Sequence, residues 1–382
     1  AGESAADVQK AGLSDASLDA IKEALRTELS RSDGTTAKER VHAGHILGRL
    51  GDPREEVTTL EEMQFCLVPG GPFMMGGSDE NALEDEKPAG EYDELSYSYW
   101  MGRFPVTNAQ FGKFVEAKGY EIEEIWKEAR DAQRWEGGRF VDDPDYFEND
   151  PRTGPVSYGE PYDLPNHPVV GVTWYECLAF SRWLTQEWQR EHGLAEDWAF
   201  RLPTEPEWEK AARGGINIPT ENQRRKLSQV ALLMRPGGLS DAEAQANPNP
   251  GRTYPWGHAA ELDTASSEHL NFNETQIGST NAVGSFPLGV SVFGSEEMSG
   301  GVLEWCLNRS ADYPYEPGDG REEIDEKMDS RVLRGGSFAS DSRFVRCAYR
   351  GRDVPDFRIN CIGFRLCLSP ISSSLISEPS DL

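Results

Sequence analysis

Several patterns are missing from this chain, and each absence excludes a class of protein. No run approaches the ~20 apolar residues of a membrane-spanning helix, and no charged-then-apolar leader opens the chain. None of the six cysteines forms a C-x-x-C pair, so they predict no zinc site. Scattered cysteines in a chain of this length are typical of buried thiols in a reducing compartment. We therefore expect a cytoplasmic protein without membrane insertion, with disulfides as the alternative.

Basic residues are scarce: 38 Lys and Arg face 66 Asp and Glu, a net charge of −28. This balance argues against nucleic acid or an anionic membrane as a partner, and its main consequence is solubility. Histidines are few and dispersed. His42 and His45 lie three apart on a predicted helix without a third ligand nearby, so we expect packing or surface residues there. The sequence predicts no metal site and no cofactor.

Glu, Lys, Gln, Met, Trp and His are all absent from Arg331–Pro370, although Glu and Lys are common elsewhere. The two ends of this stretch look like scaffold. Arg334-Gly335-Gly336-Ser337 predicts a tight glycine turn, and Ile362–Leu366 alternates like a half-buried strand. Between them no amphipathic period is visible. An unpatterned interior inside a rigid frame predicts a recognition surface rather than a core.

The chain before this stretch divides into a helical part and a part made of short strands. Residues 1–60 predict two helices, the second capped by Thr36 and closed by Gly51. They would either form a docking or tethering element or pack on the main domain, and we favour packing. Phe65–Val68 and Phe73–Gly76 predict a β-hairpin, and the acidic segment 79–94 predicts a solvated loop. Residues 370–382 form a tail.

An ordered series of short motifs spans residues 63–369 and resembles the formylglycine-generating-enzyme (sulfatase-modifying factor) family. The resemblance implies an α+β, C-type-lectin-like fold of the formylglycine-generating-enzyme type, irregular and rich in loops, behind a short N-terminal helical segment. Seven motifs in family order make a coincidental match implausible. They are Val68–Gly76, Pro105–Asn108, Pro168–Trp174, Arg201–Glu209, Tyr254–Gly257, Leu303–Trp305, and Arg334–Ser337 with Gly363–Arg365.

At one place the sequence lacks the residues that the chemistry of this family requires. The family's enzyme oxidises a substrate cysteine with a copper-binding cysteine pair just after the RGGS turn, because copper(I) favours soft thiolates. Aligned from that turn, Ser340 stands where the first cysteine would be, and the second falls in a gap. Cys347 lies beyond and is expected to be buried. We therefore expect no catalytic residue and a protein that is not an enzyme.

Two other metals known in the family lose ligands here as well. The iron-dependent sulfoxide synthases that share this domain need a histidine triad from an added helical bundle, which the short N-terminal segment does not supply. The family's calcium loop, Gly-Asn-x-x-Glu, corresponds to residues 300–304, where Gly301 replaces the Asn and removes an oxygen ligand. Glu304 is therefore expected to make structural hydrogen bonds.

The C-terminal stretch also resembles the variable region of proteins diversified by retroelements, which use the same fold. There a reverse transcriptase randomises template adenines, often in AAC codons, which never yields Glu, Lys, Gln, Met or Trp. The frame residues that match are Arg331–Ser337, Arg346, Ala348, Arg350, Pro355, Asp356, Arg358 and Ile362–Arg365. Phe338 is uncertain, and the other candidate diversified positions are Ala339, Ser340, Asp341, Phe344, Tyr349, Gly351, Arg352, Asp353, Val354, Phe357, Ile359, Asn360 and Cys361.

The residue types assign roles within that region. Apolar anchors would come from Phe344, Tyr349, Phe357 and Ile359, and polar rim contacts from Asp341, Arg352 and Asp353. Four arginines are expected to hold the frame through carbonyls and carboxylates: Arg334, Arg350, Arg358 and Arg365.

We therefore expect a receptor-like protein that is not an enzyme and binds a variable macromolecular ligand, a protein, through this diversified region. Two alternatives remain. The first is a formylglycine-generating-enzyme-like copper oxidase or a degenerate relative of it. The second is a structural lectin-like domain that serves a larger assembly through the N-terminal helices.

Overall fold

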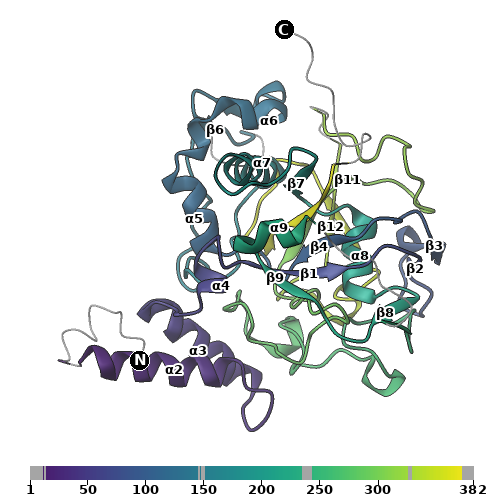
Figure 1. Ribbon diagram of the computed structural model, residues 1–382, viewed down its shortest axis with the longest axis horizontal. Coiled ribbons are helices and arrows are strands. Elements are labelled where there is room, and N and C mark those ends of the chain that lie inside the picture. Colours follow the sequence, from purple (N-terminus) through teal and green to yellow (C-terminus); the bar gives the residue numbers. More distant parts are fainter. Residues whose placement is uncertain are drawn as a thin grey trace.

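The computed structural model describes residues 12, 14–144, 147, 151–234, 243–325 and 329–371. Most of the predicted tail and the first residues of the N-terminal segment lie outside these ranges. The described chain is a mixed α+β, loop-rich fold of the C-type-lectin-like, formylglycine-generating-enzyme type, as the sequence predicts (Figure 1). None of the helices within the described ranges is long and apolar enough to cross a membrane.

Both predicted N-terminal helices are present, as α2 (Asp15–Leu29) and α3 (Ala37–Leu50). Thr36 and Glu39 cap α3 reciprocally, and Gly51 ends it with a φ of 86°. The pair projects at the lower left of Figure 1, and α3 lies between α2 and the sheets. The Arg40 guanidinium donates to the Ser285 carbonyl at 2.8 Å. Helix α3 is thus packed on the main domain, as the favoured interpretation expects.

A glycine face lets α3 approach the body closely. An added Cβ at Gly48 would lie 2.4 Å from Oδ1 of Asn166, whose amide donates to the Gly44 carbonyl and to Asp52. We expect Gly48→Ala to lower the free energy of unfolding by ~1–3 kcal/mol, measured by urea unfolding. Gly112→Ala is the control, since a Cβ there meets nothing within 4 Å. An equal or smaller loss for Gly48→Ala than for Gly112→Ala would contradict the close approach.

The larger sheet is antiparallel and has the order β7-β15-β4-β1-β9. Its strands are β7 (Trp198–Arg201), β15 (Cys367–Pro370), β4 (Tyr99–Gly102), β1 (Gln64–Val68) and β9 (Arg224–Lys226). The predicted hairpin of residues 65–68 with 73–76 is wrong. Strand β1 pairs with β4 and β9 on its two edges, so β2 (Phe73–Met75) pairs with β3 (Gly90–Tyr92) instead.

Three helices, each capped by the threonine before it, pack against the strands: α5 (Asn108–Glu116), α7 (Trp174–Glu191) and α8 (Glu205–Arg213). Aromatic rings join α5 to α7 and to the C-terminal stretch, with Phe111 and Phe180 centroids 5.3 Å apart and Phe364 edge-on to both. The remaining elements are α4 (Glu55–Thr58), α6 (Lys127–Asp131), α9 (Val230–Leu233), β5 (Trp135–Glu136), β6 (Arg139–Phe140), β8 (Asn217–Pro219) and β10 (Ala244–Ala246).

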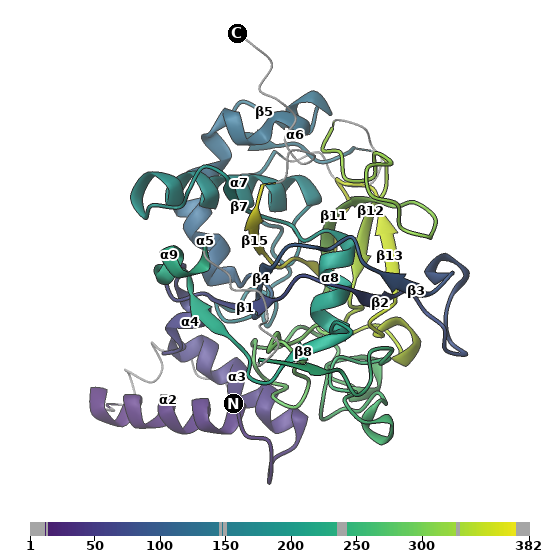
Figure 2. The same cartoon turned by 45° about the vertical axis from the view of Figure 1, so that its right-hand side comes forward.

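The C-terminal stretch contributes strands to both sheets. The smaller sheet has the order β13-β12-β11-β14, with β13 (Arg350–Asp353), β12 (Arg331–Arg334), β11 (Leu303–Arg309) and β14 (Ile362–Gly363). Figure 2 shows β11, β12 and β13 side by side. Strand β14 runs parallel to β11, and the chain then enters the larger sheet as β15. Both ends of the stretch are therefore held by sheet pairing.

Candidate functional site

Burial separates the C-terminal stretch into the two sets that the sequence distinguishes. Every predicted frame residue is buried. Among the candidate diversified positions, Ala339 and Arg352 are exposed and ten others are half-buried. Cys361, 8% exposed, is the exception and is buried, as is the uncertain Phe338. The ten half-buried candidates are Ser340, Asp341, Phe344, Tyr349, Gly351, Asp353, Val354, Phe357, Ile359 and Asn360.

The glycine turn after β12 turns the following residues toward solvent. Gly335 and Gly336 have φ values of 88° and 68°, and a Cβ at Gly336 would lie 2.2 Å from the Phe344 carbonyl oxygen. Only glycine fits such a left-handed, crowded position. The Ser337 N–H donates to Ser340 Oγ at 3.0 Å, and a short 3-10 turn at Ser342–Phe344 follows. Backbone hydrogen bonds also hold the loop, from the Ser340 N–H to the Ser337 carbonyl and from the Phe344 N–H to the Asp341 carbonyl, each 3.0 Å.

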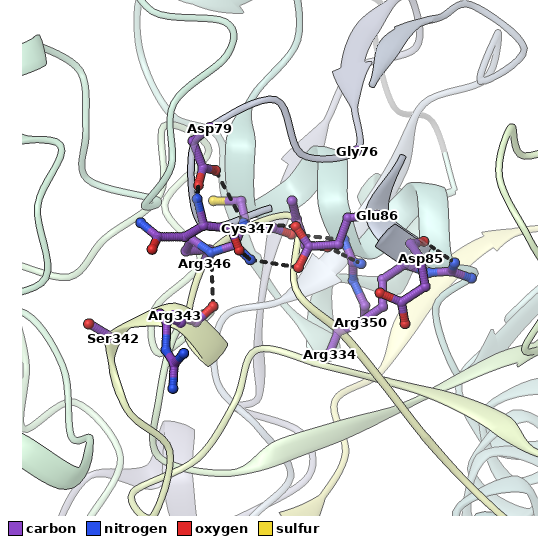
Figure 3. A network of polar contacts seen from close by, with 12 residues as sticks. Gly76, Asp79, Asp85, Glu86, Arg334, Ser342, Arg343, Arg346, Cys347 and Arg350 are labelled. Carbon is purple, nitrogen blue, oxygen red and sulfur yellow. Dashed lines mark hydrogen bonds and ion pairs between the residues drawn. The ribbon is translucent and has the colours of Figure 1, made fainter. Parts of the chain in front are cut away.

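Two frame arginines share one buried carboxylate. Arg334 donates to Glu205 at 3.3 Å, and Arg350 donates to it at 2.5 and 3.1 Å. All three side chains are almost completely buried. Arg334 also donates to the carbonyls of Cys347 and Ala348. Figure 3 shows Arg334 and Arg350 next to one another, beside Asp85 and Glu86. The shared carboxylate therefore joins β12 to β13 and to the start of α8.

The other two predicted frame arginines join distant segments. Arg365 donates to both oxygens of Glu304, at 2.6 and 2.7 Å, and to the carbonyls of Gly102 and Glu296. Arg358 donates to both oxygens of Asp142, at 2.9 and 2.7 Å. Bidentate charge-assisted bonds of this kind are among the strongest in proteins. The predicted role of the four arginines in holding the frame is confirmed.

A fifth arginine, Arg346, anchors the acidic segment that the sequence predicts to be a solvated loop. Its guanidinium donates to Glu86 at 2.6 and 2.8 Å, to Asp79 at 3.2 Å and to the Asn81 carbonyl, while Nε donates to the Arg343 carbonyl (Figure 3). Glu86 is fully buried. Burial raises the pKa of its carboxyl more than Arg346 lowers it. The prediction of a solvated loop is wrong around Glu86, because an ion pair draws it inward.

The predicted apolar anchors lie in two places. The rings of Phe344 and Tyr349 meet edge to face with centroids 5.3 Å apart, and the Arg343 guanidinium lies 5.2 Å from the Phe344 ring. Phe357 and Ile359 pack partly against the main core, and Phe357 lies 6.1 Å from Phe147.

Sequence reasoning missed the neighbours supplied by residues 121–163, an insertion between α5 and α7. Besides Phe147, they include Tyr162, whose ring lies 6.0 Å from that of Phe338. The insertion is rich in aromatic residues, and nothing local in the sequence shows what they contact. Of the predicted rim residues, Asp341 pairs with Arg343 at 2.9 Å near the surface, and contact with a ligand stays a prediction.

The residues present do not fit the copper site that the family resemblance implies. Ser340 occupies the first cysteine position, and all six cysteines are free and buried. Burial raises the pKa of the Cys347 thiol to about 12 and raises that of Cys361, so neither is a ready thiolate. Within the described part of the chain, no group of three His, Cys, Asp or Glu side chains could hold a metal ion. Glu304 is occupied by Arg365 and by the Trp208 indole N–H at 2.7 Å, which confirms its structural role.

Comparison with known proteins gives a consistent family match. Residues 51–370 match the family model of the sulfatase-modifying factor enzyme 1-like domain. The hercynine oxygenase of Mycolicibacterium smegmatis is 30% identical over 78% of the chain and 60% of its own length. The formylglycine-generating enzyme of Thermomonospora curvata is 27% identical over 80% of the chain and 94% of its own. The chain thus spans about 60% of the length of that hercynine oxygenase.

Solved structures that resemble this chain include PvdO from Pseudomonas aeruginosa, with a TM-score of 0.49 and 21% identity over 79% of this chain and 92% of that one. Treponema denticola variable protein 1 has a TM-score of 0.47 and 18% identity, over 80% of this chain and 95% of its own.

The curated relatives correct one expectation from the sequence. Hercynine oxygenase and formylglycine-generating enzyme are enzymes, so the prediction that this chain is not an enzyme is wrong. That prediction rested on the two missing cysteines, on the missing histidine triad and on the resemblance to retroelement-diversified proteins. Missing ligands at one position exclude the chemistry that needs them and do not remove a chain from a family of enzymes.

Proposed function

Because the chain belongs to the sulfatase-modifying factor enzyme 1-like family, we propose that it uses this scaffold to present a ligand-binding surface formed by the candidate diversified positions between residues 339 and 361. The ligand is a macromolecule, a protein, and the side chains that touch it are set by retroelement diversification. Residues 331–337 and 362–365 provide the constant frame. This proposal concerns recognition and leaves open a catalytic activity elsewhere on the same scaffold.

The observation that carries the proposal is the geometric separation of two sets of positions within one segment. Twelve of the thirteen candidate positions reach the surface, whereas every frame residue is buried. Every residue of the segment, frame included, is of a type that a randomised AAC codon can encode, so the composition agrees with diversification without separating the two sets. Substitution at exposed positions changes stability little, whereas substitution in a packed frame is costly. Randomisation confined to the first set would leave the fold intact.

The residue types on the surface favour a protein ligand. Protein interfaces combine aromatic and aliphatic anchors with a polar rim, and a few anchors carry most of the binding energy. The half-buried Phe344 and Tyr349 already contact one another and are therefore partly preorganised. The exposed Arg352 lies on the edge strand β13, where a rim contact would lie.

Sequencing this locus across sibling isolates tests the proposal. We expect substitutions to concentrate at the candidate positions, the frame codons to stay constant, and the adjoining DNA to hold a reverse transcriptase. A near-copy of the codons for residues 334–365 that differs at adenines should lie nearby. Substitutions spread evenly over frame and surface, or the absence of both neighbouring elements, would contradict diversification.

Oxidation of a substrate by oxygen is the second candidate function, because the chain's relatives include an oxygenase and a formylglycine-generating enzyme. The segment after the RGGS turn offers no copper thiolates, so a copper mechanism has no ligands there. The test is to incubate the chain with a Cys-x-Pro-x-Arg peptide, copper, oxygen and an excess of a thiol reductant, and in parallel with hercynine, ferrous iron, oxygen and a thiol that can supply the sulfur. An aldehyde or an oxidised hercynine would establish the activity, and unchanged substrates in both would exclude these two reactions.

A further inference from the structure

The contact between α3 and the body of the fold holds two histidines that the surface described above does not use. His45 lies on α3 and His167 belongs to the body, and their ring centroids are 4.9 Å apart at an interplanar angle of 35°. His167 is fully buried. In the described part of the chain, Nε2 of each ring is buried without a hydrogen-bond partner. Unpaired buried polar atoms are rare in native proteins and call for a reason.

The rest of this contact is closely packed. Nδ1 of His167 lies 2.9 Å from Oγ1 of Thr280, and the Thr280 backbone hydrogen-bonds to His45. Cβ of Ala282 would lie 2.6 Å from a Cβ added at Gly44, one residue before His45. The two rings therefore lie against each other beside a place where α3 packs closely on the body.

The charged groups around the pair do not compensate a second positive charge. Arg54 faces His167 from the loop after α3, although Asp52 pairs with it at 2.7 Å. Around His45 lie Arg49 and His42 on α3 itself, and Glu160 on the insertion, which is bound to Arg49 at 2.7 Å. On the same helix Arg40 pairs with Glu268. Burial is the main cause that lowers the pKa of both imidazoles, that of His167 the more strongly.

We propose that the His45–His167 pair makes the docking of the α2–α3 hairpin sensitive to pH, so that the hairpin is held at neutral pH and released on acidification. Two neutral rings can stack across the contact. Two imidazolium rings at this distance, beside Arg54, repel one another and lose their hydration when buried.

The sign of the effect follows from proton linkage. A histidine on a released hairpin titrates near its ordinary value of about 6.5, and the docked pair titrates lower. Below about pH 6.5 the released state therefore binds more protons, and docking weakens as the pH falls. Each histidine contributes at most a tenfold rise in the opening constant per pH unit, so the pair contributes at most about a hundredfold.

Hydrogen exchange of the full chain, followed at residues 37–50 of α3, tests this device. Between pH 6.5 and 5.5 we expect the opening constant of α3 to rise more than tenfold after correction for intrinsic exchange. Strand β11 should show no such rise. His45→Gln and His167→Gln should each reduce the rise to tenfold or less, and His42→Gln, an exposed change on the same helix, should leave it unchanged.

Three results would overturn the proposal: a rise in α3 below twofold, an equal rise in β11, or a rise that His45→Gln leaves intact. The equal rise in β11 would mean that acid destabilises the whole fold rather than the docked hairpin. The His45→Gln variant decides the question if the fully buried His167 does not tolerate glutamine, because His45 is only partly buried.

Discussion

Replacing Glu205 with glutamine is expected to lower the free energy of unfolding by about 3–5 kcal/mol. Its carboxylate is fully buried and accepts hydrogen bonds from Arg334, Arg350 and the Tyr313 hydroxyl. Glutamine keeps the size of the side chain and removes its charge, which leaves Arg350 without its carboxylate partner and Arg334 with Glu209 alone. The loss would be measured as a shift in the denaturant midpoint at constant m-value.

The matched control is Glu84→Gln, the same chemical change at a side chain that is 94% exposed. Exposed substitutions of this kind change stability by roughly 0.5 kcal/mol or less. A Glu205→Gln variant that unfolds within about 1 kcal/mol of the parent protein would show that the shared carboxylate does not hold β12 to β13. The frame would then need another explanation.

The second large effect is expected for Arg346→Ala. This change leaves the fully buried Glu86 carboxyl without its counter-ion, which should cost about 3–5 kcal/mol near neutral pH. Burial already raises the pKa of Glu86, and the loss of Arg346 raises it further. A carboxyl whose folded pKa lies above its unfolded value loses stability as the pH rises. The deficit should therefore be smallest near pH 4.5 and grow toward pH 8.

Two comparisons make this prediction specific. Adding Glu86→Gln to Arg346→Ala should restore part of the lost stability and abolish the pH dependence of the deficit, since no buried carboxyl then remains to titrate. Replacing Arg343, whose side chain is 59% exposed, with alanine should change stability by roughly 0.5 kcal/mol or less. A deficit for Arg346→Ala that is the same at pH 5 and pH 8 would contradict the role assigned to Glu86.

Local signals in the sequence predicted local structure correctly. The threonine cap of α3 and the four frame arginines are where the sequence places them. These features depend on a few neighbouring residues or on a residue type with one strong preference. The exposure of positions such as Ala339 and Arg352 could also be predicted, because the segment lacks the period that a buried strand requires.

Contacts between distant segments could not be predicted in this way. Glu86 is bound by Arg346, which lies 260 residues further along the chain. Strand β1 pairs with β4 and β9 rather than with its neighbour in sequence, β2. Cys361 is buried although it follows surface positions, and its carbonyl accepts a hydrogen bond from the Leu303 N–H at the start of β11. The prediction that the chain is not an enzyme failed for another reason. A segment without cysteines says nothing about the chemistry of other members of the family or of other parts of the fold.

The most direct test of the central claim, that frame and recognition surface are separate sets of residues, is a matched pair of libraries. One randomises the thirteen candidate positions with AAC-derived codons, and the other randomises the same number of frame positions. Resistance of displayed chains to protease reports folding. We predict that most members of the first library stay folded and that most of the second do not. Similar losses in the two libraries would contradict the separation on which the proposed function rests.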